Sequence, residues 1–340
     1  MKTRKKIIAA LLAAVMLFMA AGCTTGQSNQ TTASTAAAVK TAVNVAGLNG
    51  PTGIGLVKLM ADNAAGTTAN AYKFTLDAAP TDIVPLLTTG AADIAAMPLN
   101  LAATLYNKTN GGIQILAINT LGVLYILDQS NTIISVADLK GKTIYASGQG
   151  ASPEYILDFI LTQNGIDPQK DVTIVYETDH SELAALAAAG KTNICMLPEP
   201  FVTTVLSKNS NMRIALDMTK EWEKACAKEG ISSTLAMGCI VVRTKFAKDH
   251  PDAVNNFLYE YKASVDYVNS NVAAASLLVA KQGIIPSAAL AAKAIPNCNI
   301  VSIAGTEMKN IAYQNLHVLF TANPSSIGGA EPKDDFYYGT

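Results

Sequence analysis

The chain has 340 residues, half of them hydrophobic, which is more than a single hydrophobic core usually accommodates and predicts two domains. Its 25 basic residues nearly balance its 26 acidic residues, and the basic residues form no stripe to which a nucleic acid could bind. Length and charge therefore exclude a small single-core domain and a nucleic-acid-binding protein.

The first 22 residues read as an export signal. A basic start is followed by an apolar run over residues 7–19, which is too short to span a membrane as a helix. Residues 20–23 read Ala-Ala-Gly-Cys, which resembles the box of bacterial lipoproteins and implies that diacylglycerol is attached to the sulfur of Cys23 once residues 1–22 are removed. The alternative is an ordinary secretory signal with an incidental cysteine. Removal takes away four of the 25 basic residues and no acidic one, which leaves 21 against 26.

Residues 23–40 predict a flexible tether. From position 24 onward this segment is rich in Thr, Ser, Gln, Asn, Gly and Ala, and Val39 is its only large apolar residue. Such a composition cannot bury a core. The folded part of the chain is therefore expected to start near residue 41.

An internal repeat follows the tether. Residues 43–98 reappear without a gap at an offset of 100 residues. The matched positions include residues that control backbone geometry, namely the pairs Gly50/Gly150, Gly90/Gly190 and Pro98/Pro198. The repeat predicts two similar lobes. The alternative is a chance match between two units of the same order, and in that case both units are still α/β.

Each copy of the repeat predicts the order strand, helix, strand, helix, strand. The first copy occupies residues 41–98 and the second residues 143–198. The second helix of each copy is expected to have Thr81 or Ser181 as its N-cap and to end at a glycine. This alternation is typical of a parallel sheet with right-handed crossovers and helices on both faces. The predicted fold is therefore two doubly wound α/β lobes.

Two apolar strands predict the connections between the lobes. Residues 113–127 form a run long enough to leave one sheet and enter another, and residues 232–242 could return the chain to the first lobe. Lobe 1 is thus expected to comprise residues 41–127 and 236–340, and lobe 2 residues 128–235. Between the two strands, Trp222 stands in a charged helical segment, which favours a partly exposed side chain.

The remainder of the chain is predicted to be helical. Apolar residues recur at helical spacing over residues 246–269, and shorter helices are expected over residues 273–281, 287–294 and 306–321. A tail from residue 324 onward is rich in turn residues and is expected on the surface. These helices should pack on the first lobe.

The carboxyl ends of the parallel strands predict the ligand site. In open α/β sheets the crevice at these ends is where ligands bind, and both copies place a glycine turn there. Glycine lets backbone amides approach a ligand, and the helix that follows has unpaired N–H groups. The predicted ligand-binding residues are Asn49, Gly50, Pro51, Thr52, Gly53, Gln149, Gly150, Ala151 and Ser152, together with Pro98, Leu99, Asn100 and Glu199 from the same rim. The alternative is that these are ordinary capped turns.

Several side chains near the predicted site have more than one interpretation. Glu199 stands between two prolines, so it could contact a ligand or cap and brace the hinge. Few cationic residues lie in the turns, so the ligand is expected to be an organic molecule with a polar head rather than a bare anion. Aromatic residues that could line its body, or belong to the core instead, are Tyr106, Tyr125, Tyr155 and Phe201.

Catalytic, metal and cofactor motifs find no support in the sequence. The three histidines are far apart and no nucleophile elbow or phosphate loop occurs. His180 follows Asp179, but we expect it to be a loop histidine rather than part of a dyad. The cysteines beyond Cys23 have no metal-ligand spacing and are expected to be free thiols rather than disulfides; they are Cys195, Cys226, Cys239 and Cys298.

Together these features resemble the type II periplasmic binding proteins of bacterial ABC importers. Within that group, residues 47–53, 90–98 and 197–201 resemble the family that carries nitrate, taurine, alkanesulfonates and thiamine-precursor pyrimidines. The resemblance implies a monomer that binds a small solute between two lobes and delivers it to a permease with its ATPase. It also implies attachment by lipid alone to the outer face of the cell membrane. The alternative is an extracytoplasmic enzyme, of the lyase or dehydratase type, on the same scaffold.

Overall fold

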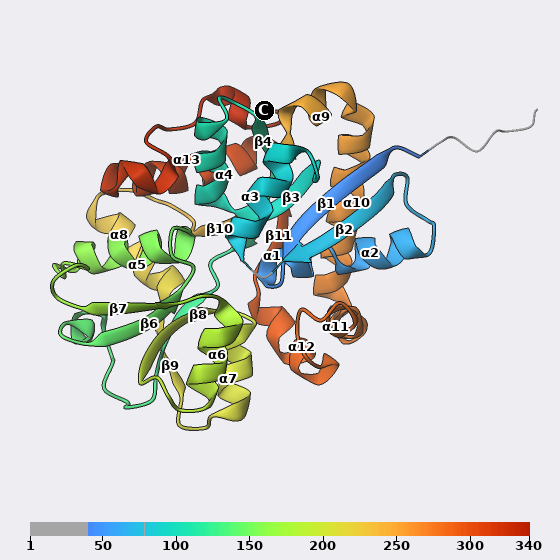
Figure 1. Cartoon of the computed structure of the whole chain (residues 1–340). Coiled ribbons are helices and arrows are strands. Elements are labelled where there is room, and N and C mark those ends of the chain that lie inside the picture. The colour runs from blue at the N-terminus through green and yellow to red at the C-terminus, as the bar shows by residue number, and fades with distance from the viewer. Residues whose placement is uncertain (1–39, 78) are drawn as a thin grey trace, which may run out of the picture. The chain divides into compact units, whose positions relative to one another are not determined.

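The computed structural model describes residues 40–77 and 79–340. The expected signal over residues 1–22, the lipidation site Cys23 and all of the expected tether except Lys40 lie outside the described residues. Figure 1 shows how the described residues fold.

The two copies of the repeat fold into the same order of elements. The first copy consists of β1 (Ala42–Leu48), α1 (Pro51–Ile54), α2 (Val57–Ala64), β2 (Ala71–Asp77), α3 (Pro80–Thr89) and β3 (Ile94–Pro98). The second consists of β6 (Thr143–Ser147), α5 (Ser152–Gln163), β7 (Thr173–Glu177), α6 (His180–Ala188) and β8 (Ile194–Pro198). The offset of 100 residues holds to the residue at β3 and β8, so the predicted pair of α/β units is confirmed.

Each copy builds three parallel strands of a larger, mixed sheet. The strand order is β2-β1-β3-β10-β4-β11 in the first sheet and β7-β6-β8-β5-β9 in the second. In both, the strand next to the parallel trio, β10 or β5, runs antiparallel. The three strands of each copy are thus parallel, as predicted, and the neighbouring strands are antiparallel because they come from the connections and enter from the opposite end.

The first connection is a strand that changes sheets. β4 (Ile113–Leu121) pairs in the first sheet and β5 (Leu124–Asp128) in the second, with Gly122 and Val123 between them. A Cβ on Gly122 would lie 2.1 Å from Thr219 Oγ1, so only glycine fits where the strand breaks. The expected lobe boundary after residue 127 thus falls inside β5, which pairs with β8 of the second sheet.

The second connection follows β9 (Arg213–Asp217) and α8 (Met218–Lys228). Irregular residues 229–235 lead from α8 to β10 (Ala236–Arg243), which pairs only in the first sheet. The chain therefore returns through a loop rather than along the predicted strand from residue 232.

Trp222 of α8 is fully buried, and its ring centroid lies 5.0 Å from that of Phe159. The expectation of a partly exposed side chain was wrong, because Met218, Trp222 and Ala225 share the inward face of α8 while the charged residues occupy the other face.

The predicted C-terminal helices are confirmed with small changes in their bounds. They are α9 (Thr244–Asp249), α10 (Pro251–Ser270), α11 (Val272–Lys281), α12 (Ala288–Ala294) and α13 (Gly305–Ala322). The prediction missed β11 (Ile300–Ile303), a four-residue edge strand beside β4, because so short a strand has too few residues for a period-two pattern. The remaining helical segments are α4 (Leu99–Lys108), α7 (Phe201–Lys208), η1 (Val136–Leu139), η2 (Ile295–Asn297), η3 (Pro324–Ile327) and η4 (Asp334–Phe336).

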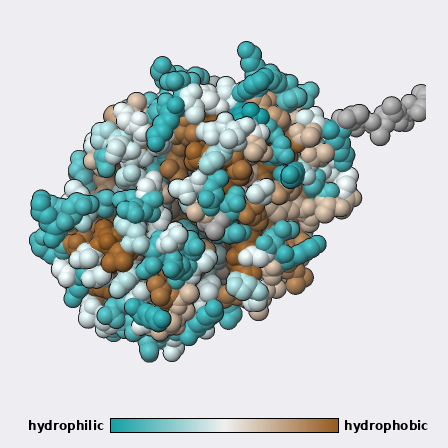
Figure 2. All heavy atoms as spheres, in the orientation of Figure 1, coloured by the Kyte–Doolittle hydropathy of each residue, from teal (hydrophilic) through white to brown (hydrophobic). Residues whose placement is uncertain are grey.

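Helices cover both faces of both sheets. In β10, Ile240 and Val242 pack with α2 and α10, whereas Cys239 and Val241 pack with α3, α4 and α13. The core on the α13 side continues into the second sheet under α5 and α8, and a separate core lies under α6 and α7. In the space-filling view, hydrophilic residues are spread over this face, and hydrophobic residues show as separate patches between them (Figure 2). The doubly wound architecture is therefore confirmed.

The C-terminal tail packs on the first sheet rather than lying loosely on the surface. Phe336 is fully buried, and its ring centroid lies 4.9 Å from that of Tyr106 on α4. The tail thus lies on the surface, as expected from its turn residues, and its two buried aromatic residues, Phe336 and Tyr337, anchor it there. No helix among the described residues has both the length and the hydrophobicity needed to cross a bilayer.

Candidate functional site

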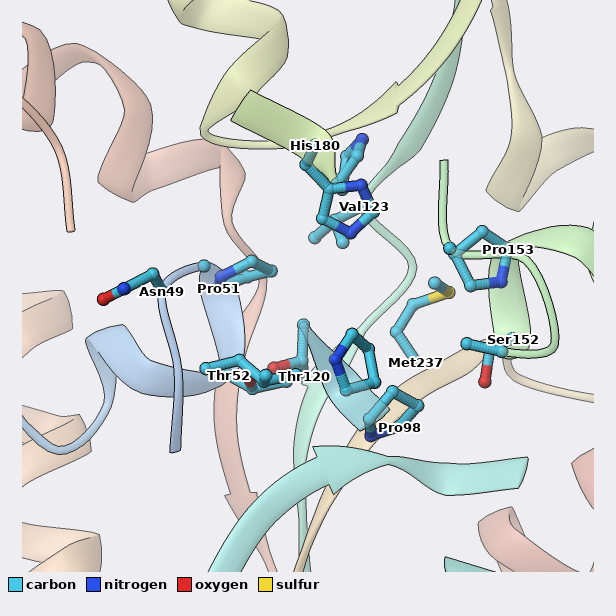
Figure 3. Close-up of a pocket in the computed structure, with 16 residues that line it drawn as sticks. Asn49, Pro51, Thr52, Pro98, Thr120, Val123, Ser152, Pro153, His180 and Met237 are labelled. Carbon is cyan, nitrogen blue, oxygen red and sulfur yellow. The ribbon is translucent and has the colours of Figure 1, made fainter. Parts of the chain in front are cut away.

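A pocket lies where the carboxyl ends of strands from the two sheets meet (Figure 3). The space between its walls, with the part that opens to solvent included, is about 590 Å³. The lining residues are Leu48, Asn49, Gly50, Pro51, Thr52, Pro80, Pro98, Thr120, Val123, Gly148, Ala151, Ser152, Pro153, His180, Pro198 and Met237. The position matches the crevice expected for an open α/β sheet.

Equivalent elements of the two copies contribute equivalent parts of the pocket. The first turns of α1 and α3 contribute from the first copy, and those of α5 and α6 contribute from the second. Pro98 and Pro198, the last residues of β3 and β8, complete the rim. The internal repeat therefore places four helix starts around one space.

Seven of the predicted ligand-binding residues line this pocket. They are Asn49, Gly50, Pro51, Thr52, Pro98, Ala151 and Ser152. Six others do not line it: Gly53, Leu99, Asn100, Gln149, Gly150 and Glu199. Four of these six residues make structural contacts beside the pocket: Gly53, Asn100, Gly150 and Glu199.

Gly53 and Gly150, the two predicted glycines that do not line the pocket, are needed for the backbone conformation. A Cβ on Gly53 would lie 2.2 Å from the carbonyl oxygen of Leu48, so α1 can approach the end of β1 only with glycine there. Gly150 has φ of 74°, and its amide donates a hydrogen bond to the carboxylate of Glu154 in the first turn of α5. That amide is therefore already paired within the chain.

Asn100 of α4 links the first lobe to the second. Its Oδ1 accepts a hydrogen bond from Ser152 Oγ at 3.0 Å, and its Nδ2 lies 3.4 Å from the carbonyl oxygen of Gly150. The same Nδ2 donates to the carbonyl of Ser326 at 3.0 Å. Asn100 is fully buried, so it holds the start of α5 against the first lobe beside the pocket.

Glu199 caps a helix. Its carboxylate accepts hydrogen bonds from the amide and the hydroxyl of Thr203, at 3.0 and 2.9 Å, in the first turn of α7. The side chain is 2% exposed, and this burial raises the pKa of the carboxyl. Of the two interpretations left open by the sequence, the hydrogen bonds match the capping one.

His180 lines the pocket, which the sequence analysis did not anticipate. It is the first residue of α6 and not a loop residue, and Asp179 rather than Ser181 caps the helix by accepting a hydrogen bond from the Glu182 amide at 2.8 Å. The other expected cap, Thr81, is likewise inside its helix, because α3 begins at Pro80. His180 occupies the position equivalent to Pro80, which also lines the pocket, but the sequence predicted neither of them as a site residue.

A hydrogen bond from within the second lobe orients the His180 ring. Its Nδ1 lies 2.6 Å from Ser147 Oγ at the end of β6. Burial lowers the pKa of His180 to about 4, so the imidazole is neutral at pH 7. Because none of the lining residues is Asp, Glu, Lys or Arg, the pocket walls carry no charged side chain at that pH.

The connections supply three further lining residues that the sequence did not predict, and the copies of the repeat supply the rest: Leu48, Pro80, Gly148, Pro153 and Pro198. Thr120 stands near the end of β4, Val123 lies between β4 and β5, and Met237 belongs to β10. Their place in the pocket depends on where the chain crosses between the sheets, for which the sequence has no local signal.

The aromatic residues proposed to line the ligand body lie elsewhere. None of Tyr106, Tyr125, Tyr155 and Phe201 is among the lining residues. Phe201 packs against His180, with ring centroids 5.5 Å apart. Prolines take the place of aromatic walls in the pocket.

Within the described residues, no cluster of His, Cys, Asp or Glu side chains is suited to hold a metal ion. The cysteines at positions 195, 226, 239 and 298 are all buried and unpaired, as expected from their apolar surroundings.

A protein-family model described as NMT1/THI5 like matches residues 73–275, which is more than half of the chain. The chain belongs to the NMT1/THI5-like family. Among curated proteins, YtlA of Bacillus subtilis (strain 168) is 22% identical over 156 residues, which cover 38% of this chain and 47% of that protein. The alignment thus spans about half the length of this relative.

Solved structures share the fold of this family member over nearly its whole length. An ABC transporter structure from Parabacteroides distasonis has a TM-score of 0.71 at 23% identity and covers 88% of this chain and 99% of the other. The alkanesulfonate-binding protein SsuA of Xanthomonas axonopodis pv. citri, bound to MOPS, has a TM-score of 0.65 at 15% identity, with 87% and 96% covered. The aliphatic sulphonate binding protein SsuA of Escherichia coli has a TM-score of 0.65 at 17% identity, with 86% and 92% covered. The predicted periplasmic-binding-protein fold is thereby confirmed.

Proposed function

We propose that this protein is the solute-binding component of an ABC importer. It binds a small organic molecule in the pocket between its two sheets and delivers it to a permease that works with an ATPase. The observation that carries the proposal is one pocket lined by equivalent turns of both copies of the repeat. Structural relatives that are named as sulfonate-binding proteins support the same role.

The proposed location is the outer face of the cell membrane, on the periplasmic side if the cell has two membranes. The support is the basic, apolar N-terminal segment followed by the lipoprotein-like sequence at residues 20–23. Metabolic labelling with a radioactive fatty acid tests the anchor, because Cys23→Ala should abolish incorporation. Labelling of the Cys23→Ala variant would refute acylation at this residue.

Binding without turnover is the property that tests the proposed role. Native mass spectrometry of freshly purified protein should show an adduct of one small molecule per chain, and adding that molecule to stripped protein should raise the unfolding temperature. Chromatography of the released compound should return it unchanged. Conversion of the compound to a product would instead favour the alternative of an extracytoplasmic lyase or dehydratase.

A further inference from the structure

We infer that the pocket selects an uncharged polar solute, held at one end by the hydroxyls of Thr52 and Thr120 and at the other by the imidazole of His180. The inference rests on the proposed function and adds the chemical class of the solute and the groups that recognise it.

The pocket lacks most of the features with which a protein usually binds an oxyanion. Helix starts bind anions through free backbone N–H groups, but proline occupies one of the first two positions of α1, α3 and α5. The Gly150 amide, at the start of α5, is taken by the carboxylate of Glu154. No Arg or Lys lines the pocket to supply the missing positive charge.

Two hydroxyls on the first-lobe side have no partner among the described residues. Thr52 is 7% and Thr120 0% exposed, both residues line the pocket, and neither Oγ1 makes a hydrogen bond. Buried polar groups are rarely left unpaired, and each costs about 1–3 kcal/mol when it is. Both oxygens are themselves buried, so rotation of each side chain toward the pocket would let a bound solute donate to or accept from its hydroxyl.

Thr52 and Thr120 form one site because they border the same glycine. A Cβ on Gly238 would lie 2.6 Å from Thr52 Cγ2 and 3.5 Å from Thr120 Cβ. Asn119, next to Thr120, donates from Nδ2 to the carbonyl oxygen of Thr52 at 3.4 Å, which holds the two segments together. Figure 3 shows the two threonines beside one another.

The opposite end of the pocket offers His180. Ser147 occupies Nδ1, so Nε2 is the ring nitrogen left for a ligand. A neutral imidazole donates from one nitrogen and accepts at the other, and the Ser147 hydroxyl can fill either role toward Nδ1. The ring therefore matches a neutral donor or acceptor and supplies no charge to balance an anion.

Prolines define the body of the solute. Five of the lining residues are prolines, contributed by both lobes: Pro51, Pro80, Pro98, Pro153 and Pro198. Their rings are rigid and apolar and offer no N–H donor. The space between the two polar ends thus fits a compact apolar body, and burial of that body would contribute to affinity.

The test compares solutes of matched shape and different charge. Thermal shift and calorimetry with the mature protein are carried out with nicotinamide against nicotinate, uracil against orotate, and methanesulfonamide against methanesulfonate, each up to millimolar concentration. Mass spectrometry and chromatography identify any copurified solute, and its net charge at pH 7 follows from its chemical structure. We expect the uncharged member to bind at least ten times more tightly in any pair that binds, and the copurified solute to be uncharged.

Tighter binding of the anionic members, or an anionic copurified solute, would overturn the inference and leave the proposed function intact. The complete absence of an adduct and of any thermal shift would count against the proposed function as well. The two failures are therefore distinguishable.

Substitution of the hydroxyls tests the named contacts. Thr120→Val and Thr52→Val should each weaken binding of the solute identified above at least tenfold, without lowering the unfolding temperature of the empty protein, because the hydroxyls have no partner to lose. Thr192→Val is the matched control, since Thr192 Oγ1 is also buried without a partner but is not in the pocket. Unchanged affinity in the Thr120 and Thr52 variants would refute the assignment.

Discussion

His180 is the one titratable side chain among the lining residues of the pocket. Its pKa of about 4 in the folded protein lies below the ordinary value of 6.5, because burial disfavours the charged ring. The unfolded chain therefore binds a proton at a higher pH than the folded chain does. The free energy of unfolding therefore falls as the pH is lowered from 6.5 toward 4, and above pH 6.5 this histidine does not make it depend on pH.

His180→Asn removes this titration and keeps a polar group near Ser147. We expect the stability of the wild type to fall more steeply than that of the variant between pH 6.5 and 4, as measured by thermal unfolding. Parallel pH profiles for wild type and His180→Asn would contradict a half-buried imidazole that is neutral in the folded protein.

Asp158 on α5 has a pKa that is raised rather than lowered. Burial, and then the nearby Glu154, raise the pKa of its carboxyl to about 6, and its Oδ1 has no hydrogen-bond partner among the described residues. Because the folded-state pKa is raised, the charge destabilises the fold fully above pH 6 and not at all below about pH 4. Asp158→Asn should therefore stabilise the protein at pH 7.5 by about 1 kcal/mol, a value reduced for partial exposure. Urea titrations that show no gain at pH 7.5, or the same gain at pH 4, would contradict this environment.

At the scale of elements, the glycines at the starts of α1 and α5 differ in how much room surrounds them, although the equivalent pair Gly50 and Gly150 is open on both sides. A side chain on Gly53 meets the backbone of β1, whereas a Cβ on Gly150 has nothing within 4 Å. The predicted ligand turn at Gly150 is thus open, and its constraint is only the positive φ. The close approach of α1 to the end of β1, which Gly53 permits, places Thr52 in the pocket.

Gly53→Ala should displace α1, lower the free energy of unfolding by about 2 kcal/mol through overpacking and weaken solute binding. Gly150→Ala should cost about 1 kcal/mol through strain at positive φ and leave affinity nearly unchanged. Urea denaturation and calorimetry measure both quantities. A larger loss of affinity in Gly150→Ala than in Gly53→Ala would show that the α5 turn contacts the solute.

At the scale of the molecule, the two lobes share more than their chain connections. The core on the α13 side runs from the first sheet into the second, and Asn100 adds hydrogen bonds between α4 and the start of α5. If the lobes separate to release solute, these hydrogen bonds must break. Asn100 is therefore positioned to favour the closed arrangement.

Asn100→Ala should increase the radius of gyration of the solute-free protein, measured by X-ray scattering, and weaken binding about tenfold, because closure loses its hydrogen bonds. Asn107→Ala is the matched control on the same helix, since Asn107 binds only the C-terminal segment, through the carbonyls of Ile327 and Ala330. Identical scattering and affinity for wild type and Asn100→Ala would exclude this role.

Local sequence patterns were sufficient to predict the two α/β units and most of their turns. The repeat, the glycines that end helices and the helical periodicity after residue 244 act over a few residues, so they are readable without tertiary contacts. They also located the strand that changes sheets, although not its break at Gly122. Seven of the predicted site residues line the pocket for the same reason, because the carboxyl ends of parallel strands meet wherever such units fold.

The tertiary structure alone decided which side chains complete the site. Thr120 and Met237 reach the pocket only through the crossing of the two connections, and His180 does so through the pairing of its ring with Ser147. The Glu199 carboxylate caps the first turn of α7, and Trp222 is buried in the core. Each outcome depends on which distant residues lie next to the side chain, and a sequence read along one chain does not contain those distances.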